Sequence, residues 1–275
     1  MVFEPKCRGF IGVEGNILGD QMLTKKQLSV LARENGISLF TQERDYVQVL
    51  FLSRLYEKKS SLVFKGGTYL KLVHGLPRFS EDLDFNSNQK TREIRILLEN
   101  SIKDMELVGV EAKLNSEKKL KTGVGYRLRY KGPLYDGRPV TMGSIGIDVS
   151  LRKDMVLEPN LYTIPSKYPE ISPFLAYCMP VKEIFAEKIR ALLKRSKPRD
   201  VYDVWFLLNK GLELDSTLIK KKMKLQGLEF DIEKLRSKIY KQGENWDRDL
   251  STLLKPIPNF EAVKNDLIEK LKVLF

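Results

Sequence analysis

The chain has 275 residues, of which 42% are hydrophobic and 31% charged, a composition typical of a globular protein of one large or two modest domains. Its 48 Lys and Arg outnumber its 36 Asp and Glu, and the net charge of +12 favours a polyanionic partner such as nucleic acid. A single histidine, His74, and two distant cysteines, Cys7 and Cys178, argue against a multi-histidine zinc site and a disulfide framework. No apolar run is long enough to span a bilayer and no signal peptide is apparent, so we expect a reduced, cytoplasmic protein without a membrane partner.

The chain begins with glycine-dotted residues 1–20, for which we expect an extended arm. Thr24 and Gln27 form a capping-box pattern that predicts a helix to about Asn35. A second helix is expected over residues 41–58, where apolar residues recur loosely at helical spacing. We expect this helix to pack on the strand that follows it.

The next segment joins a short strand, a double glycine and a short helix. Residues 62–64 are expected to form a buried strand, which Gly66 and Gly67 end with a turn that has no Cβ in the way. Thr68 is expected to cap a helix that runs to His74, which we interpret as a helix-end residue. Backbone N–H groups at such a turn form a cradle for phosphate, so the pattern predicts a nucleotide site.

Two carboxylates follow this helix. Gly75 and Pro77 end the helix, and the segment from Asp82 to Phe85 is expected to be extended, with Asp82 and Asp84 pointing to one face. Two such carboxylates can bind one metal ion together. The alternative from the residues alone is a solvated strand edge, since Asp-x-Asp often occurs by chance.

The order of strand, Gly-Gly-Thr, helix and Arg-x-Ser-x-Asp-x-Asp resembles the opening motif of the polymerase-beta-like nucleotidyltransferases. The segment FKGGTYLKLVHGLPRFSEDLDF is similar to the AbiEii family, nucleotidyltransferase-like toxins of type IV toxin–antitoxin systems. The resemblance extends from about Thr24 to Leu208. It implies metal binding by Asp82 and Asp84, and nucleotide binding by Gly66, Gly67, Thr68, Arg78 and Ser80.

After these aspartates the pattern predicts a helix over residues 91–107 and then strands at 111–119, 124–131 and 142–151. This order suits a mixed sheet in an α+β core, and the resemblance implies that the fold is a nucleotidyltransferase-like mixed β-sheet with flanking helices. Asp148 stands among apolar residues of the last strand, either as a strand-end carboxylate in solvent or as a site residue. The family pattern implies that it is a third metal ligand beside Asp82 and Asp84.

Three carboxylates at close range would repel one another without a cation. The resemblance therefore implies a site for two Mg²⁺ ions, one activating the attacking hydroxyl and the other neutralising the triphosphate of an NTP. Such a site would drive in-line attack on the α-phosphate, with pyrophosphate as the leaving group.

Five prolines between residues 152 and 180 indicate a segment that crosses between domains. Together with the resemblance, this segment predicts N-terminal helices with a nucleotidyltransferase core at residues 1–160, a crossing segment at 161–180 and an α-helical C-terminal domain at 181–275. Helices within this last domain are expected over residues 181–195, 198–211, 232–240 and 260–274.

The segment AEKIRALLKRSKPRDVYDVWFLL is similar to the later AbiEii motifs, in which a helix-borne lysine precedes Arg-Asp-x-x-Asp. Matching residue by residue assigns Lys188, Arg199, Asp200 and Asp203 to the site. The resemblance implies that Lys188 and Arg199 bind the nucleotide and that one aspartate orients the lysine or acts as a base. From spacing alone, the same residues could form salt bridges on a solvated helix face.

Two basic segments remain. The run of Lys220, Lys221, Lys222 and Lys224 is expected to be solvated. In the segment from Tyr126 to Lys131, arginines alternate with aromatic residues, so they could contact phosphates while a ring stacks on a base. An ordinary half-buried strand has the same pattern.

The motifs and the resemblance predict an enzyme that uses Mg²⁺ to transfer a nucleoside monophosphate from an NTP to an acceptor hydroxyl. For an AbiEii-like toxin the acceptor is expected to be RNA, such as a tRNA 3′ end, and the partner a cognate antitoxin. Two alternatives stay open: transfer to a protein or small molecule, and a non-catalytic nucleic-acid-binding module.

Overall fold

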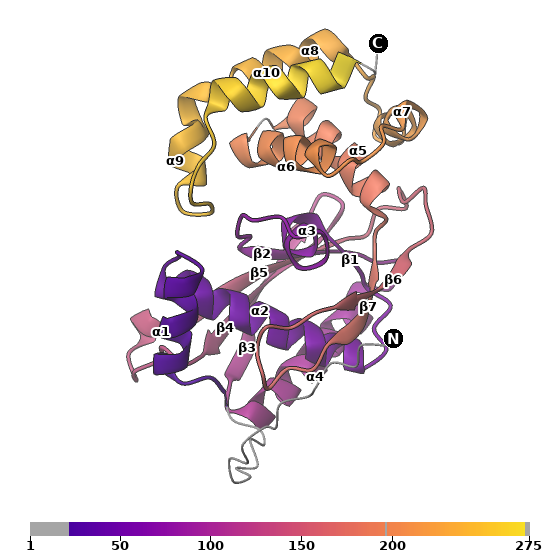
Figure 1. Ribbon diagram of the computed structural model, residues 1–275. Helices are drawn as coiled ribbons and strands as arrows, with labels where there is room; N and C mark the ends of the chain where they lie inside the picture. The colour runs from indigo at the N-terminus through magenta and orange to yellow at the C-terminus, as the bar shows by residue number, and fades with distance from the viewer. Residues whose placement is uncertain (1–21, 196, 273–275) are drawn as a thin grey trace, which may run out of the picture.

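A computed structural model describes residues 22–195 and 197–272, which form a lobe built on a β-sheet and a lobe of helices (Figure 1). The sheet lobe lies at the bottom of Figure 1 and the helical lobe at the top. The predicted α+β architecture is confirmed. The expected arm at residues 1–20 and Cys7 lie outside the described residues.

The strands are β1 (Val63–Lys65), β2 (Asp82–Asn86), β3 (Glu111–Leu120), β4 (Gly123–Lys131), β5 (Gly143–Ser150), β6 (Asn160–Ile164) and β7 (Phe174–Cys178). Together they form one mixed sheet in the order β3-β4-β5-β2-β1-β7-β6. β2 is parallel to β5 and β1 is parallel to β7, whereas the other neighbours are antiparallel. The strands predicted at 111–119, 124–131 and 142–151 are thus present, with bounds that differ by one residue.

Helices of the sheet lobe are α1 (Lys25–Glu34), α2 (Leu39–Glu57), α3 (Gly66–His74) and α4 (Thr91–Met105), with a short 3₁₀ turn at Glu106–Val108. The capping box of Thr24 and Gln27 is present at the start of α1, as predicted. α2 begins two residues before its predicted start because the Ser38 side chain accepts a hydrogen bond from the backbone N–H of Thr41. His74 is the last residue of α3, as expected.

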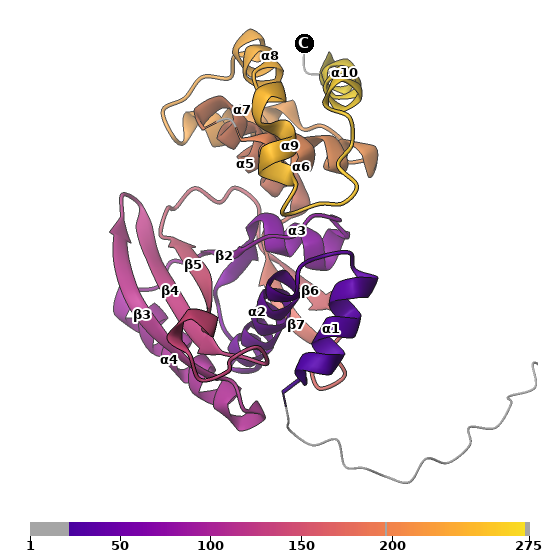
Figure 2. The same ribbon diagram turned by 90° about the vertical axis from the view of Figure 1, so that its left-hand side faces the viewer.

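One face of the sheet is covered by α2 and α4, which pack against each other and against the strands (Figure 2). Apolar strand residues such as Leu83, Phe85 and Ile147 are fully buried beneath these helices. Because strand side chains alternate between faces, Asp82 and Asp84 point to the opposite side. We call this second side the open face.

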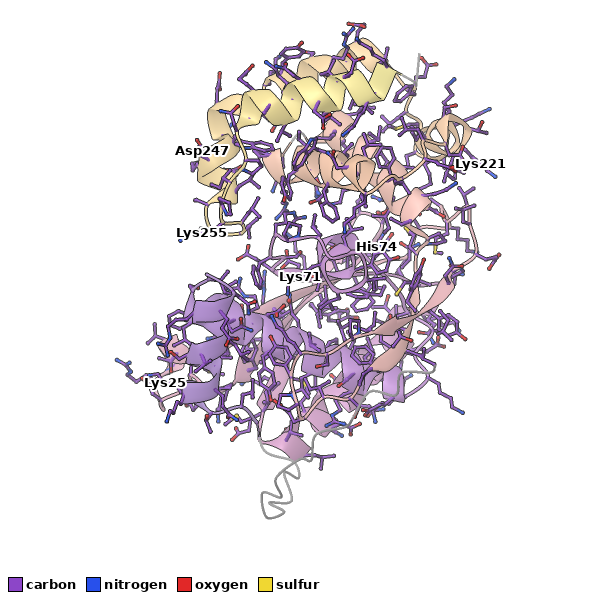
Figure 3. The ribbon with its side chains drawn as sticks, viewed as in Figure 1. Lys25, Lys71, His74, Lys221, Asp247 and Lys255 are labelled. Atoms are coloured by element: carbon purple, nitrogen blue, oxygen red, sulfur yellow. The ribbon has the colours of Figure 1, made fainter. Side chains whose placement is uncertain are left out.

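The helical lobe consists of α5 (Val181–Lys194), α6 (Pro198–Asn209), α7 (Ser216–Lys224), α8 (Ile232–Tyr240), α9 (Trp246–Leu250) and α10 (Phe260–Leu271). Short 3₁₀ turns lie at Pro139–Thr141 in the sheet lobe and Gly243–Asn245 in the helical lobe. Figure 3 shows Lys71 and His74 of α3 at the junction of the lobes, with Lys255 in the loop between α9 and α10. The Phe79 N–H donates to the Leu253 carbonyl across this junction at 2.8 Å. No helix in the described part of the chain is both long and apolar enough to cross a membrane.

The structure differs from the prediction in the segment expected to cross between domains. Residues 161–180 hold most of β6 and all of β7, which extend the sheet to Cys178. The prolines that suggested a linker flank these two strands, where a missing N–H is tolerated, and do not interrupt them. The sheet thus continues past residue 160. The domain boundary predicted there remains a proposal.

The expected solvation of the lysine run is wrong for one of its members. Lys222 is fully buried, and its ammonium contacts Glu183 at 2.8 Å and Glu187 at 3.2 Å. It also donates to the Asp154 carbonyl at 2.7 Å. Lys222 therefore joins α7 to α5 and to the loop that follows β5, because a buried ammonium needs partners of this kind.

Candidate functional site

Three aspartates predicted from the sequence lie on the open face, on two adjacent strands. The pairing of β2 with β5 places Asp84 beside Asp148, and Asp82 beside Gly146. A Cβ on Gly146 would clash with the Asp82 carboxylate, and a Cβ on Gly66 would clash with the Asp84 carboxylate. The two glycines therefore leave the space that these carboxylates occupy. We call Asp82, Asp84 and Asp148 the carboxylate row.

The carboxylate row is under mutual electrostatic repulsion. Burial raises the pKa of the partly buried Asp84, and the charges of Asp148 and Asp82 raise it further, against the opposing effect of Lys65 and Lys188. Partial desolvation and then the charge of Asp82 raise the pKa of Asp148, against the opposing effect of Arg127 and Lys118. Raised pKa values of neighbouring carboxylates mean that a bound cation would be favoured there.

No group of three or more His, Cys, Asp or Glu side chains is positioned to hold a metal ion within residues 22–195 and 197–272. The side chains of the carboxylate row therefore do not converge in this conformation. Its donor chemistry nevertheless fits Mg²⁺, which prefers carboxylate oxygens, and the row is only partly buried. The assignment of a metal to Asp82, Asp84 and Asp148 stays a prediction.

The turn between β1 and α3 lies directly beside this row. Gly66 has a positive φ of 81° and begins the helix. A Cβ on Gly67 would lie 2.8 Å from Ser80 Oγ and 2.9 Å from Arg78 Nη2, so the segment that precedes β2 packs tightly against the helix start. The glycine pair predicted for nucleotide binding is thus next to the carboxylates.

The role expected for Thr68 as a helix cap is wrong. The helix begins at Gly66, its N-cap position is Lys65, and no side chain caps it. The hydroxyl of Thr68 donates to the Asp82 carbonyl at 2.7 Å. Thr68 therefore fixes β2 relative to α3, and it acts on the site through the backbone of Asp82.

A pocket of about 350 Å³ opens beside Asp84, between the β1–α3 turn and α5. Among its lining residues only Asp84 and Glu187 are acidic. Six others are basic: Lys65, Arg152, Lys188, Arg190, Lys194 and Arg195. An excess of cations beside a helix N-terminus suits a polyphosphate. We call this cavity the basic pocket.

Sequence reasoning found Lys188 but missed the other five cations of the basic pocket. Three of them follow Lys188 in the chain: Arg190 and Lys194 on α5, and Arg195 at its C-cap. Arg195, seven residues after Lys188, returns to the same side of the helix, so helical spacing could have indicated Arg195 but not the other two. Lys65 and Arg152 come from the sheet lobe, and no local pattern links them to α5.

Lys188 is held between the two aspartates of α6. Its ammonium lies 2.7 Å from Asp203 and 3.2 Å from Asp200. Asp200 also accepts from Arg195 Nε at 2.9 Å and Nη2 at 3.0 Å. Both carboxylates are fully buried. Although burial opposes it, Arg78 and Lys188 hold the pKa of Asp203 below its ordinary value, and Lys188 and Arg195 do the same for Asp200.

Arg78 was expected to bind the nucleotide, but the structure buries it in a contact between the lobes. Its side chain is 2% exposed and forms a bidentate ion pair with Asp203, at 2.5 Å from Nε and 2.6 Å from Nη2. It also donates to the Phe79 carbonyl at 2.9 Å. Arg78 does not line the basic pocket, and its contacts connect the segment before β2 to α6.

Arg199 is the sequence-predicted residue that the structure places apart from the others. It lines a separate recess of about 210 Å³ together with Glu81 and Arg248, whereas Lys188 and Asp84 line the basic pocket. Ser80, by contrast, lies against Gly67 at the start of α3.

Glu187 was also missed, although it precedes Lys188 in the chain. Its carboxylate contacts Lys65 of β1 at 3.1 Å and Lys222 of α7 at 3.2 Å. Although burial opposes it, Lys65, Lys222 and Arg190 lower the pKa of Glu187 to about 2. This ion pair joins the two lobes at the basic pocket, and only the tertiary structure brings its members together.

Comparison with known proteins identifies the family. The model described as nucleotidyl transferase AbiEii toxin, type IV TA system, matches residues 50–266. The chain belongs to the AbiEii family. It is therefore a nucleotidyltransferase of the toxin class found in type IV toxin–antitoxin systems. The matched region contains the carboxylate row, the glycine pair and the basic pocket.

Solved structures share the fold of this AbiEii member. MenT4, a nucleotidyltransferase toxin from Mycobacterium tuberculosis H37Rv, has a TM-score of 0.66 at 18% identity and covers 92% of this chain and 89% of its own. JHP933 from Helicobacter pylori has a TM-score of 0.54 at 20% identity and covers 86% of this chain and 93% of its own. No curated protein matches the chain by sequence.

Proposed function

We propose that this AbiEii-family protein transfers a nucleoside monophosphate from an NTP to a hydroxyl of RNA, such as a tRNA 3′ end, in a Mg²⁺-dependent reaction. The observation that carries the proposal is the position of Asp84, which belongs to the carboxylate row and also lines the basic pocket. A triphosphate in that pocket would therefore lie against the carboxylates. Membership of a type IV toxin family further supports a cognate antitoxin as a partner.

The basic pocket is suited to the triphosphate by charge and by position. Its lining holds six basic side chains against two carboxylates, although Lys188 and Arg195 also pair with the aspartates of α6. Gly66 borders the pocket at the first turn of α3 and has no side chain of its own, and the Asp84 carboxylate lies against it. Lys65 and Lys188 approach Asp84 from opposite lobes, so both can contact phosphate oxygens bound next to it.

The carboxylate row would hold the metal, with Asp84 between the nucleotide pocket and Asp148. When bound, Mg²⁺ supplies charge neutralisation to the triphosphate and lowers the pKa of the attacking hydroxyl. Gly66 and Gly146 give the Asp84 and Asp82 carboxylates the space that they occupy, because no Cβ fills it. Asp82 is held in place through its carbonyl, which accepts from Thr68.

Lys188 is a positioned cation in this proposal, and the aspartates of α6 orient it. Asp200 and Asp203 each bind two basic side chains, and their lowered pKa values make them weak proton acceptors at neutral pH. The orienting role is therefore favoured over the role of a base for both residues. Arg78 and Arg195 complete the set of cations that fixes these carboxylates.

The experiment that tests the function is incubation with each of four α-labelled NTPs, Mg²⁺ and total cellular RNA, followed by separation of RNA from protein. We expect label on RNA for at least one NTP, and no label with the Asp84→Asn variant or when EDTA removes the metal. Label on protein instead would move the function to protein nucleotidylylation. Absence of transfer with every NTP would favour a non-catalytic nucleic-acid-binding module.

A further inference from the structure

The open face continues beyond the carboxylate row as a basic surface on β3 and β4. The register of these strands places Lys113 opposite Arg129, and Ser116 opposite Arg127. Lys118 lies opposite Gly125, which in turn lies opposite Asp148. Side chains of paired residues share a face, so the four cations lie on the same side as Asp148. We call Lys113, Lys118, Arg127 and Arg129 the basic strip.

The cations of the basic strip have no ion-pair partner in the described part of the chain, although the charges of Arg127 and Lys118 lower the pKa of Asp148. Within the described residues none of the four forms a salt bridge, and Arg129 donates from Nη2 only to the Pro139 carbonyl, at 3.4 Å. Glu111, the acidic residue on this face of the hairpin, is paired with Lys131 at 2.5 Å. The strip is therefore a positive surface without salt bridges of its own, and it leads to Asp148.

The NTP and the acceptor are expected to approach the carboxylate row from opposite sides. Across the sheet the order is Lys118, Gly125, Asp148, Asp84 and Lys65. The basic pocket is lined from the Lys65 side, and none of its lining residues belongs to β3 or β4. In an in-line displacement the attacking hydroxyl approaches opposite to the leaving pyrophosphate. The acceptor must then reach the row from the side of β4 and β3.

From this geometry we infer that the basic strip binds the 3′-terminal single strand of the acceptor RNA and directs its terminal hydroxyl to Asp148. This inference rests on the proposed nucleotidyl transfer and adds the surface that positions the acceptor. Arg127 and Arg129 are two residues apart on β4, a spacing of about 7 Å, which suits successive phosphates of an extended strand. Gly125 and Gly146 have no side chain and leave the space that the Asp148 and Asp82 carboxylates occupy at this end of the strip.

The strip contacts phosphates and does not stack on bases. Tyr126 and Tyr130, whose rings were considered for stacking, are 4% and 1% exposed and point to the face covered by α4 and α2. That stacking interpretation is wrong because alternate strand residues face opposite sides. We therefore expect binding along the strip to depend on charge and to show little dependence on base sequence.

The same surface is poorly suited to a protein acceptor. No exposed large apolar residue of the described chain lies on β3 or β4. Protein interfaces are usually anchored by aromatic or apolar side chains, whereas phosphate binding needs exposed cations. The composition of the strip therefore favours RNA.

The test compares two double variants with the same loss of charge. Lys118→Gln/Arg127→Gln removes two cations of the strip. Lys103→Gln/Lys119→Gln removes two exposed cations of the same lobe, where Lys119 follows Lys118 in sequence but lies on the other face of β3. Binding to a short fluorescein-labelled single-stranded oligoribonucleotide is measured across a range of salt concentrations, alongside NTP affinity and transfer rate.

We expect the strip variant to weaken oligoribonucleotide binding and to lower the slope of log affinity against log salt by about 0.7 for each phosphate that the variant no longer binds. The KM for RNA should rise while NTP affinity stays unchanged, and the control variant should behave like the wild type. If the two variants have equal effects and the wild type still transfers to RNA, RNA binding by the basic strip would be refuted, whereas the proposed function would stand. Transfer to protein only, or no transfer, would overturn both.

Discussion

Two groups of aspartates, close in space, have opposite electrostatic environments. In the carboxylate row the acids lie beside one another, and the pKa values of Asp84 and Asp148 are raised. On α6 each acid binds two cations, and the pKa values of Asp200 and Asp203 are lowered. In the row, burial and mutual repulsion outweigh the nearby cations, whereas the acids of the α6 group are neutralised by direct ion pairs. We call the second group, Arg78, Lys188, Arg195, Asp200 and Asp203, the paired cluster.

The difference shows that aspartates of the sequence motifs have two roles: those of α6 form buried ion pairs, whereas those of the carboxylate row remain available to a cation. Arg78 and Asp203 stand in motifs far apart in the chain, but they meet in a buried ion pair that joins the lobes. Removing one member of such a pair leaves a buried charge without a partner, which is costly. Removing one member of the carboxylate row relieves repulsion. Stability and activity should therefore separate between the two groups.

The largest expected effect comes from substituting one acid in each group. Asp203→Asn should lower the free energy of unfolding by about 3–5 kcal/mol, because Arg78 loses its buried partner. Asp84→Asn should abolish nucleotidyl transfer while leaving stability equal to the wild type or higher. Denaturant unfolding and the labelled-NTP assay measure the two quantities. The comparison fails if both variants lose stability to the same extent.

A smaller effect is expected from pH, through Glu187. Its pKa is lowered from 4.5 to about 2, so its stabilising contribution is present above pH 4.5 and is lost as the pH falls toward 2. The contribution at neutral pH is on the order of 3 kcal/mol as an upper limit. We expect the difference in unfolding free energy between the wild type and Glu187→Gln to shrink over this window. A difference that stays constant between about pH 6 and about pH 2 would refute the ion-pair account.

A glycine beside the carboxylate row gives a third comparison, for which the chain provides a matched control. Gly66 and Gly75 both have positive φ, but a Cβ on Gly66 would clash with Asp84, whereas a Cβ on Gly75 meets nothing within 4 Å. Gly75→Ala should cost about 1–2 kcal/mol from backbone strain alone. Gly66→Ala should cost about 1–3 kcal/mol more and should also lose transfer. Normal activity in Gly66→Ala would show that the position of Asp84 is not critical.

Sequence alone predicted the local elements and the local part of the site. The capping box of Thr24, the strands of residues 111–151 and the glycine pair next to Asp82 and Asp84 follow from patterns within a few residues. The family resemblance added the fold class, which the comparisons confirm. Local patterns succeed here because capping, strand alternation and turn formation depend on neighbours in the chain.

Tertiary structure decided which residues pair and which stay free. The strands β6 and β7 were missed because their flanking prolines resemble a linker, and their place in the sheet depends on pairing with β1. Lys222 was expected to be a solvated lysine, but it is buried in an ion pair with Glu183 of α5. Arg78 was expected to bind the nucleotide, but it is buried in an ion pair with Asp203 of α6. Sequence shows the charge of a side chain, but its partner is set by the packing of distant segments, and the partner determines whether that charge stabilises the fold or remains available for a substrate.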